Sequence, residues 1–63
     1  MKGEYDEAIE DYNAALRLDP EFAAAYYFRG LSWSEKGEQE EASEDFRESM
    51  RLDPKIGAPR KDR

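Results

Sequence analysis

The residues of this 63-residue chain that could take part in chemistry are mainly carboxylates. They form two clusters at corresponding places in the sequence: Glu7, Glu10 and Asp11, and then Glu38, Glu40, Glu41, Glu44 and Asp45. Paired carboxylates can act in hydrolysis or bind Ca²⁺. A calcium loop needs alternating acidic or amide ligands around a glycine turn, and neither cluster has that pattern. We therefore interpret these acids as solvent-exposed charges on the polar faces of helices.

The chain lacks the other residue types on which catalytic and metal sites depend. It has no histidine and no cysteine, which excludes histidine-activated nucleophiles, thiolate chemistry, disulfides and the usual zinc sites. Its four glycines are dispersed and form no phosphate-binding loop. We predict a protein that is not an enzyme and that uses no cofactor and no metal ion.

The net charge of −6 restricts the class of partner. Residues 1–54 carry 15 acids and 6 bases, whereas residues 55–63 carry 4 bases and 1 acid. An acidic body does not favour nucleic acid or an anionic membrane, and no apolar run approaches the roughly 18 residues of a membrane span. Together with the lack of cysteine and of a signal peptide, these features predict a soluble, cytoplasmic protein. Residues 55–63 are predicted to be a flexible basic tail, with docking on an acidic surface as the alternative.

The sequence repeats itself after 34 residues. When residues 2–20 are aligned with residues 36–54, 11 of the 19 pairs are identical, and Tyr12/Phe46 and Leu16/Met50 keep their apolar character. Internal similarity at such a period indicates stacked helical repeats, in which each unit buries its apolar face against a neighbour. We therefore predict an all-α domain over residues 1–54, with three antiparallel helices in a helix-turn-helix repeat.

The predicted helices cover about residues 4–18, 20–36 and 38–52. Apolar residues of the first recur at helical spacing from Tyr5 to Leu16. Asp19-Pro20 is expected to end this helix and to begin the next one at once, with Asp19 as the N-cap. Gly37 is expected to end the second helix.

The first and third predicted helices differ in the width of their apolar stripe. Gln39, Ser43 and Ser49 stand in the third where Tyr5, Ile9 and Ala15 stand in the first. We interpret the third helix as the outer, capping end of a stack. The stripe Tyr5, Ile9 and Tyr12 is then expected to lack a neighbour within this chain, and its partner would lie upstream of Met1 in a longer protein.

In these features the sequence resembles the tetratricopeptide repeat family. The family motif has an aromatic residue, a Leu-Gly pair and a second aromatic residue on one helix, then Ala-x3-aromatic and a closing proline on the next. One complete unit and a preceding half unit match: Tyr26, Arg29-Gly30, Trp33, Ala42, Phe46 and Pro54, after Ala8, Tyr12 and Pro20. Arg29 stands where leucine is usual. Gly30 and Ala42 are expected to let the second and third helices approach closely.

The resemblance implies a non-catalytic protein–protein interaction module, part of a scaffold or adaptor, with ligands on the concave surface. In this chain the residues lining that surface would be Ala24, Tyr27, Phe28 and Leu31 of the second helix. None is among the Lys, Asn and Arg residues with which some family members hold a peptide's terminal carboxylate. The implied ligand is therefore a hydrophobic or amphipathic segment of a protein or peptide. The alternative is that Tyr27, Phe28 and Leu31 are core residues.

Self-association is the alternative function. A second copy of the chain would cover Tyr5, Ile9 and Tyr12 and give a two-fold homodimer, or helices would be exchanged about the Lys36-Gly37 turn. A dimer is therefore expected at high concentration.

Overall fold

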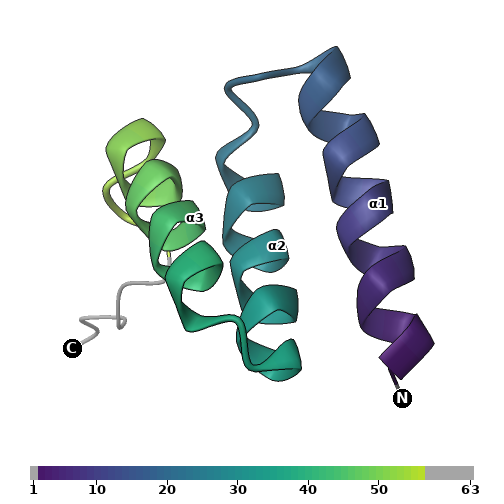
Figure 1. Ribbon diagram of the computed structural model, residues 1–63. Helices are drawn as coiled ribbons and strands as arrows, with labels where there is room; N and C mark the ends of the chain where they lie inside the picture. The colour runs from purple at the N-terminus through teal and green to yellow at the C-terminus, as the bar shows by residue number, and fades with distance from the viewer. Residues whose placement is uncertain (1, 57–63) are drawn as a thin grey trace, which may run out of the picture.

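The computed structural model describes residues 2–56, which form three α-helices and no β-strand (Figure 1). The helices are α1 (Lys2–Leu18), α2 (Ala23–Lys36) and α3 (Gln39–Leu52). They lie side by side in alternating directions, with α2 between α1 and α3 (Figure 1). The predicted all-α helix-turn-helix architecture is confirmed. None of the helices in residues 2–56 is long and apolar enough to cross a membrane.

The turn at Asp19-Pro20 differs from its prediction, because α2 begins at Ala23 and not at Pro20. The Asp19 side chain accepts a hydrogen bond from the backbone N–H of Glu21 (3.1 Å), and the Asp19 carbonyl accepts one from the N–H of Phe22 (3.1 Å). Since the carboxylate of Asp19 is used inside this turn, it does not cap α2. Phe22 takes the N-cap position and makes no side-chain capping bond.

The same turn recurs 34 residues later, after α3. The Asp53 side chain accepts a hydrogen bond from the N–H of Lys55 (3.2 Å), and the Asp53 carbonyl accepts one from the N–H of Ile56 (3.0 Å). The internal repeat of the sequence is thus also a repeat of backbone geometry, and Ile56 takes the place of Phe22. The remainder of the predicted basic tail, residues 57–63, lies outside the described residues.

Gly37 ends α2 in the left-handed conformation, with φ at 90°. Its N–H donates to the carbonyl of Ser34 (3.0 Å), and the N–H of Glu38 donates to the carbonyl of Trp33 (2.9 Å). This pair of bonds is a Schellman motif, which satisfies carbonyls that a helix end otherwise leaves unpaired. The helix end predicted at Gly37 is confirmed.

The close approach of α2 and α3 depends on two small residues. The ring of Phe46 lies over Gly30, where an added Cβ would come within 2.7 Å of a ring carbon. Ala42 of α3 is buried, with an exposed fraction of 2%. The close packing expected at Gly30 and Ala42 is therefore present.

The packing of α1 corrects one expectation. Ile9 is only 6% exposed, and Tyr5 and Tyr12 are half-buried. Among the described elements α1 packs on α2 alone, so α2 covers this stripe. The expectation that Tyr5, Ile9 and Tyr12 lack a neighbour within the chain is wrong, because α2 is apolar enough on its α1 side to bury them.

Candidate functional site

Because α2 lies between α1 and α3, its other two sides have no neighbouring helix within residues 2–56. Successive residues of an α-helix are turned by about 100°, so residues two positions apart lie on nearly opposite sides. Arg29 therefore lies on one open side and Leu31 on the other. We call the side with Arg29 the ionic face and the side with Leu31 the aromatic face.

A row of four aromatic rings crosses all three helices on the aromatic face. Tyr12 of α1 stacks on Phe28 of α2 with ring centroids 6.2 Å apart. Phe28 meets Tyr27 edge to face at 5.7 Å, and Tyr27 meets Phe46 of α3 at 5.5 Å. These separations are typical of favourable aromatic pairs. We call these four residues the aromatic row.

The predicted binding residues lie together on this face at helical spacing. Phe28 is 46% exposed and Leu31 is 41% exposed, whereas Ala24 and Tyr27 are half-buried. A single exposed apolar residue is ordinary on a protein surface. Phe28 belongs to the aromatic row, and Leu31 follows Tyr27 and Phe28 by one helical turn, so the four predicted residues lie on the same side of α2 as the row.

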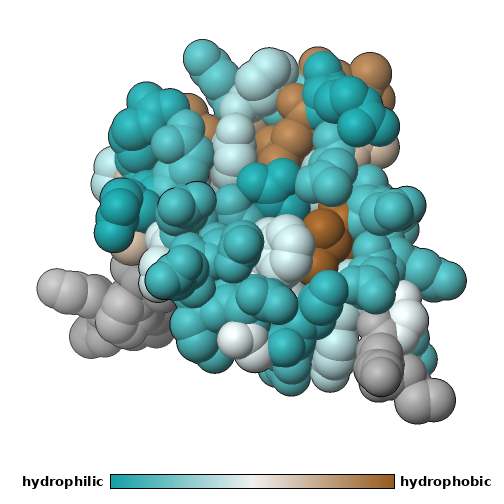
Figure 2. Space-filling view, viewed as in Figure 1, coloured by the Kyte–Doolittle hydropathy of each residue, from teal (hydrophilic) through white to brown (hydrophobic). Residues whose placement is uncertain are grey.

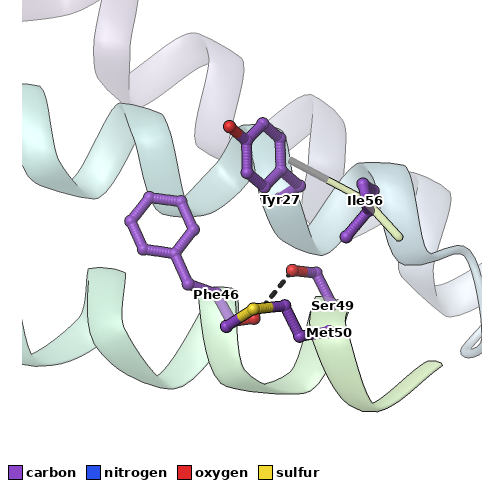
Figure 3. A pocket seen from close by; sticks show the side chains of 5 residues that line it. All are labelled: Tyr27, Phe46, Ser49, Met50 and Ile56. Atoms are coloured by element: carbon purple, nitrogen blue, oxygen red, sulfur yellow. Dashed lines mark hydrogen bonds between the residues drawn. The ribbon is translucent and has the colours of Figure 1, made fainter. Parts of the chain in front are cut away.

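A pocket of about 280 Å³ opens at the α3 end of the row (Figure 3). Side chains of α2, α3 and the turn after α3 line it: Tyr27, Phe46, Ser49, Met50 and Ile56. The hydroxyl of Ser49 donates to the carbonyl of Phe46 (2.8 Å), so its hydrogen-bonding capacity is largely used within α3 (Figure 3). The lining that remains for a ligand is mainly aromatic and aliphatic.

Four of these pocket residues are absent from the predicted binding residues: Phe46, Ser49, Met50 and Ile56. From the sequence, Phe46 is identified only as a residue of the repeat motif, and Ile56 only as part of the predicted tail. The sequence repeat aligns Met50 with Leu16, so both positions are apolar. In the structure Leu16 is buried, whereas Met50 is half exposed. The difference arises because α1 is followed by α2, which packs against the side that carries Leu16. No further helix in the described part of the chain follows α3 to cover the side that carries Met50.

On the ionic face, Arg29 links the three helices. Its Nε and Nη2 atoms donate to the two carboxylate oxygens of Asp45 on α3, at 2.8 and 2.7 Å. Its Nη1 atom donates to Asn13 of α1 at 2.7 Å. The hydrogen bonds that Arg29 donates to Asp45 raise the pKa of Arg29 above its ordinary value. The residue that departs from the family motif therefore holds the helices together.

Asp45 is the exception to the interpretation of the acids as surface charge. It is 6% exposed, whereas the other acids of both clusters are exposed. A buried carboxylate is costly unless it is paired and hydrogen-bonded, and the bidentate contact with Arg29 meets both conditions. No group of acids in residues 2–56 is arranged to hold a metal ion.

A second set of polar contacts joins the beginning of α1 to the end of α2. Lys36 lies 2.5 Å from Asp6, and the hydroxyl of Tyr5 donates to Glu35 at 3.4 Å. The bond to Asp6 raises the pKa of Lys36, and the negative charge of Glu35 raises the pKa of Tyr5. These contacts are exposed, so each contributes little to stability.

The surface outside the aromatic face is largely polar. In the view of Figure 2, most of the visible face is hydrophilic, and apolar residues appear mainly between α1 and α2 and at the upper end. The connection between α1 and α2 lies at that end in Figure 1, and Leu18 and Phe22 are exposed beside it.

The fold and its motif residues define a helical repeat protein. A family model described as TPR repeat matches residues 1–33, and one described as tetratricopeptide repeat matches residues 23–56. The chain belongs to the tetratricopeptide repeat family and contains about one and a half repeats. No curated protein and no solved structure matches the chain significantly. Motifs of this family generally mediate protein–protein interaction and are typically non-catalytic.

Proposed function

We propose that the aromatic face binds a hydrophobic or amphipathic segment of a partner protein. The observation that carries this proposal is the exposure of Phe28 and Leu31, at 46% and 41%, on the same side of α2 as the aromatic row. Covering apolar surface contributes roughly 25 cal/mol per Å², so a ligand that buries these side chains gains free energy from them. An apolar patch on an otherwise polar surface is typical of an interaction site.

The pocket indicates the size of the group that binds there. Its volume of about 280 Å³ suits one or two side chains of a peptide. A leucine, methionine or phenylalanine of the ligand would enter between Tyr27, Met50 and Ile56. A second apolar residue of the ligand would cover Leu31 and Phe28, in the helix-in-groove or extended mode of peptide recognition.

The charges favour one kind of flanking sequence. The chain has a net charge of −6, which attracts basic residues beside the apolar anchors and disfavours acidic ones. The cations of α2 are Arg29 and Lys36, and these are already bonded to Asp45 and Asp6. The α2 surface therefore offers no free cation to a peptide's terminal carboxylate, so the ligand is an internal segment or one held by its side chains.

Self-association through Tyr5, Ile9 and Tyr12 is the weaker candidate. Ile9 is buried against α2 in a single copy, so a second copy would gain little from covering it. The aromatic face has the larger exposed apolar groups and is the site that we propose.

The test begins with peptides of about 12 residues selected from a random displayed library on the full chain. Their dissociation constants are then measured for the wild type and for Leu31→Glu, by fluorescence anisotropy. We expect at least about tenfold weaker binding by Leu31→Glu, because a charge would enter the apolar contact.

Leu18→Glu is the matched control, since it makes the same change at an exposed leucine of α1. It should leave the affinity within about twofold of the wild type, and circular dichroism should show both variants to be folded. Equal affinities for the wild type and Leu31→Glu, or equal losses in the two variants, would contradict the proposed site.

A further inference from the structure

One exposed carboxylate lies on the aromatic face, beside the apolar side chains that we propose as the binding surface. Glu35 is the only acid in α2 (Ala23–Lys36), and it follows Leu31 by four residues. Side chains four residues apart on a helix lie on the same side as neighbours. Glu35 is also exposed. The aromatic face therefore carries a negative charge one helical turn beyond Leu31.

The contacts between α1 and α2 place Glu35 on this face independently of helical spacing. Tyr12 of α1 stacks on Phe28 of α2 within the aromatic row. Seven residues from each of these, the hydroxyl of Tyr5 donates to the carboxylate of Glu35 at 3.4 Å. Because the two helices run in opposite directions, the two contacts follow each other along one side of the pair, about 10 Å apart. Glu35 thus continues the line of Phe28 along the aromatic face.

Glu35 has no partner of opposite charge, unlike the two cations of α2. Both of those cations are paired with acids of the neighbouring helices. Within residues 2–56, Glu35 accepts one hydrogen bond, from Tyr5, and has no cationic partner. At 3.4 Å this bond is long and leaves most of the capacity of the carboxylate unused. The carboxylate can therefore accept a charge-assisted hydrogen bond from a cation of a ligand.

We propose that Glu35 determines which ligands the aromatic face accepts, by pairing with a lysine or arginine of the ligand. This inference rests on the proposed function, because it assumes that the ligand covers Phe28 and Leu31. Along the axis of α2, Leu31 and Glu35 are separated by about 6 Å. The basic residue therefore stands about four positions from the apolar residue on Leu31 in a helical ligand, and about two positions from it in an extended one.

A purely structural role for Glu35 explains less. Its bond to Tyr5 is exposed, so it contributes little to the packing of α1 on α2. The pair of Lys36 and Asp6 already joins the same ends of these helices. An acidic residue of a ligand at this position would meet the carboxylate at close range, and the repulsion would disfavour such a ligand. The main effect of Glu35 is therefore a choice between ligands.

The first test is a selection from a displayed library of random peptides of about 12 residues, on the full chain and on its Glu35→Lys variant in parallel. We expect the wild-type pool to be enriched in lysine or arginine at one fixed spacing, about two or four positions, from an apolar residue. The Glu35→Lys pool should lose this preference and gain aspartate or glutamate at that spacing. Lysine is favourable near the C-terminal end of a helix, so the variant should fold, which circular dichroism checks.

Glu7→Lys is the matched control, because it makes the same change of charge at an exposed glutamate of α1. Its pool should show the same preference as the wild-type pool.

The second test uses one synthetic peptide from the wild-type pool, labelled with a fluorophore for anisotropy measurements. Glu35→Gln removes the charge but keeps an oxygen that can accept the bond from Tyr5. Because an exposed ion pair is modest, we expect Glu35→Gln to bind about two- to fivefold more weakly at about 150 mM salt, with a smaller dependence on salt. The peptide with its basic residue replaced by glutamate should bind the Glu35→Lys chain more tightly than the unchanged peptide does.

The outcomes separate this inference from the proposed function. If Leu31→Glu weakens binding but the wild-type and Glu35→Lys pools are alike, the aromatic face binds the ligand and the role of Glu35 is overturned. The same change in the Glu7→Lys pool would overturn it too, since the preference would then reflect net charge alone. An unchanged dissociation constant in Glu35→Gln has the same consequence. If the wild-type chain selects no peptide, or if Leu31→Glu binds as the wild type does, the proposed function and this inference both fail.

Discussion

At the scale of single residues, Arg29 is a cation placed where its family usually has leucine. Its guanidinium donates to Asp45 and to Asn13, and so contacts both neighbours of α2. Without Arg29, the nearly buried carboxylate of Asp45 would have no partner. Removing Arg29 alone should therefore lower the free energy of unfolding more than removing both side chains. The two residues therefore act as a unit.

This coupling leads to a prediction for unfolding in urea. Arg29→Ala should lower the free energy of unfolding by about 2–3 kcal/mol, because it leaves Asp45 without its partner. The double variant Arg29→Ala/Asp45→Ala should lose less than the sum of the two single changes. A domain of this size has a total stability of roughly 3–9 kcal/mol, so the single change should be easily measured. Additive losses would show that the pair is not coupled.

Gly30 allows a second prediction at this scale. Gly30→Ala should lower the free energy of unfolding by about 1–3 kcal/mol, since the new methyl group would meet the ring of Phe46 at 2.7 Å. Gly3→Ala is the matched control, because no atom lies within 4 Å of a Cβ added there. It should be neutral or stabilising by about 0.5 kcal/mol, as alanine favours helix more than glycine does. Thermal unfolding of both variants provides the comparison, and a stable Gly30→Ala would mean that the ring is free to move.

At the scale of the helices, the beginning of α1 is joined to the end of α2 by two groups that titrate in the alkaline range. The ordinary pKa values of Tyr5 and Lys36 are 10.0 and 10.5, and the folded structure raises both. A pKa that is higher in the folded state than in the unfolded state means that the folded structure favours the protonated form of the group. The stabilisation is therefore complete below the unfolded pKa and is lost as pH rises through the folded pKa.

We predict that the midpoint temperature of thermal unfolding decreases as the pH rises above about 10, where the unfolded forms of Tyr5 and Lys36 begin to lose their protons before the folded forms do. The double variant Tyr5→Phe/Lys36→Gln should show a smaller fall, because neither raised group remains to titrate. Both contacts are exposed, so a modest difference is expected. An identical fall in the variant and the wild type would mean that these two groups contribute nothing to the pH dependence.

The helices themselves could largely be predicted from sequence, whereas their contacts could not. The helices and the end of α2 at Gly37 follow from local patterns, because apolar spacing and turn residues act within a few positions. The burial of Ile9 depends on the rotation of α1 about its axis, which no local pattern determines. The Arg29–Asp45 pair joins residues 16 positions apart on different helices.

The candidate site was also predicted in part. Ala24, Tyr27, Phe28 and Leu31 follow from helical spacing on one segment, and the structure places them on one side of α2. The pocket beside Tyr27 was not predicted, because it depends on where the turn after α3 places Ile56. A single helix face can be read from sequence, but a space between three segments requires their relative positions.

At the scale of the whole molecule, the three helices form a thin layer with different surfaces. The aromatic face presents the row of rings, Leu31 and the pocket, while the ionic face is held by Arg29.

The most direct test of the proposed aromatic face is a chemical-shift map of the backbone amides by NMR. The labelled full chain is titrated with a library-selected peptide, and the shift changes are followed residue by residue. We predict that the largest changes lie in residues 24–31, at Phe46 and from Met50 to Ile56, with little change at Asp11 or Leu18. Changes centred on α1, or spread evenly over the three helices, would contradict the assignment of the binding site to the aromatic face.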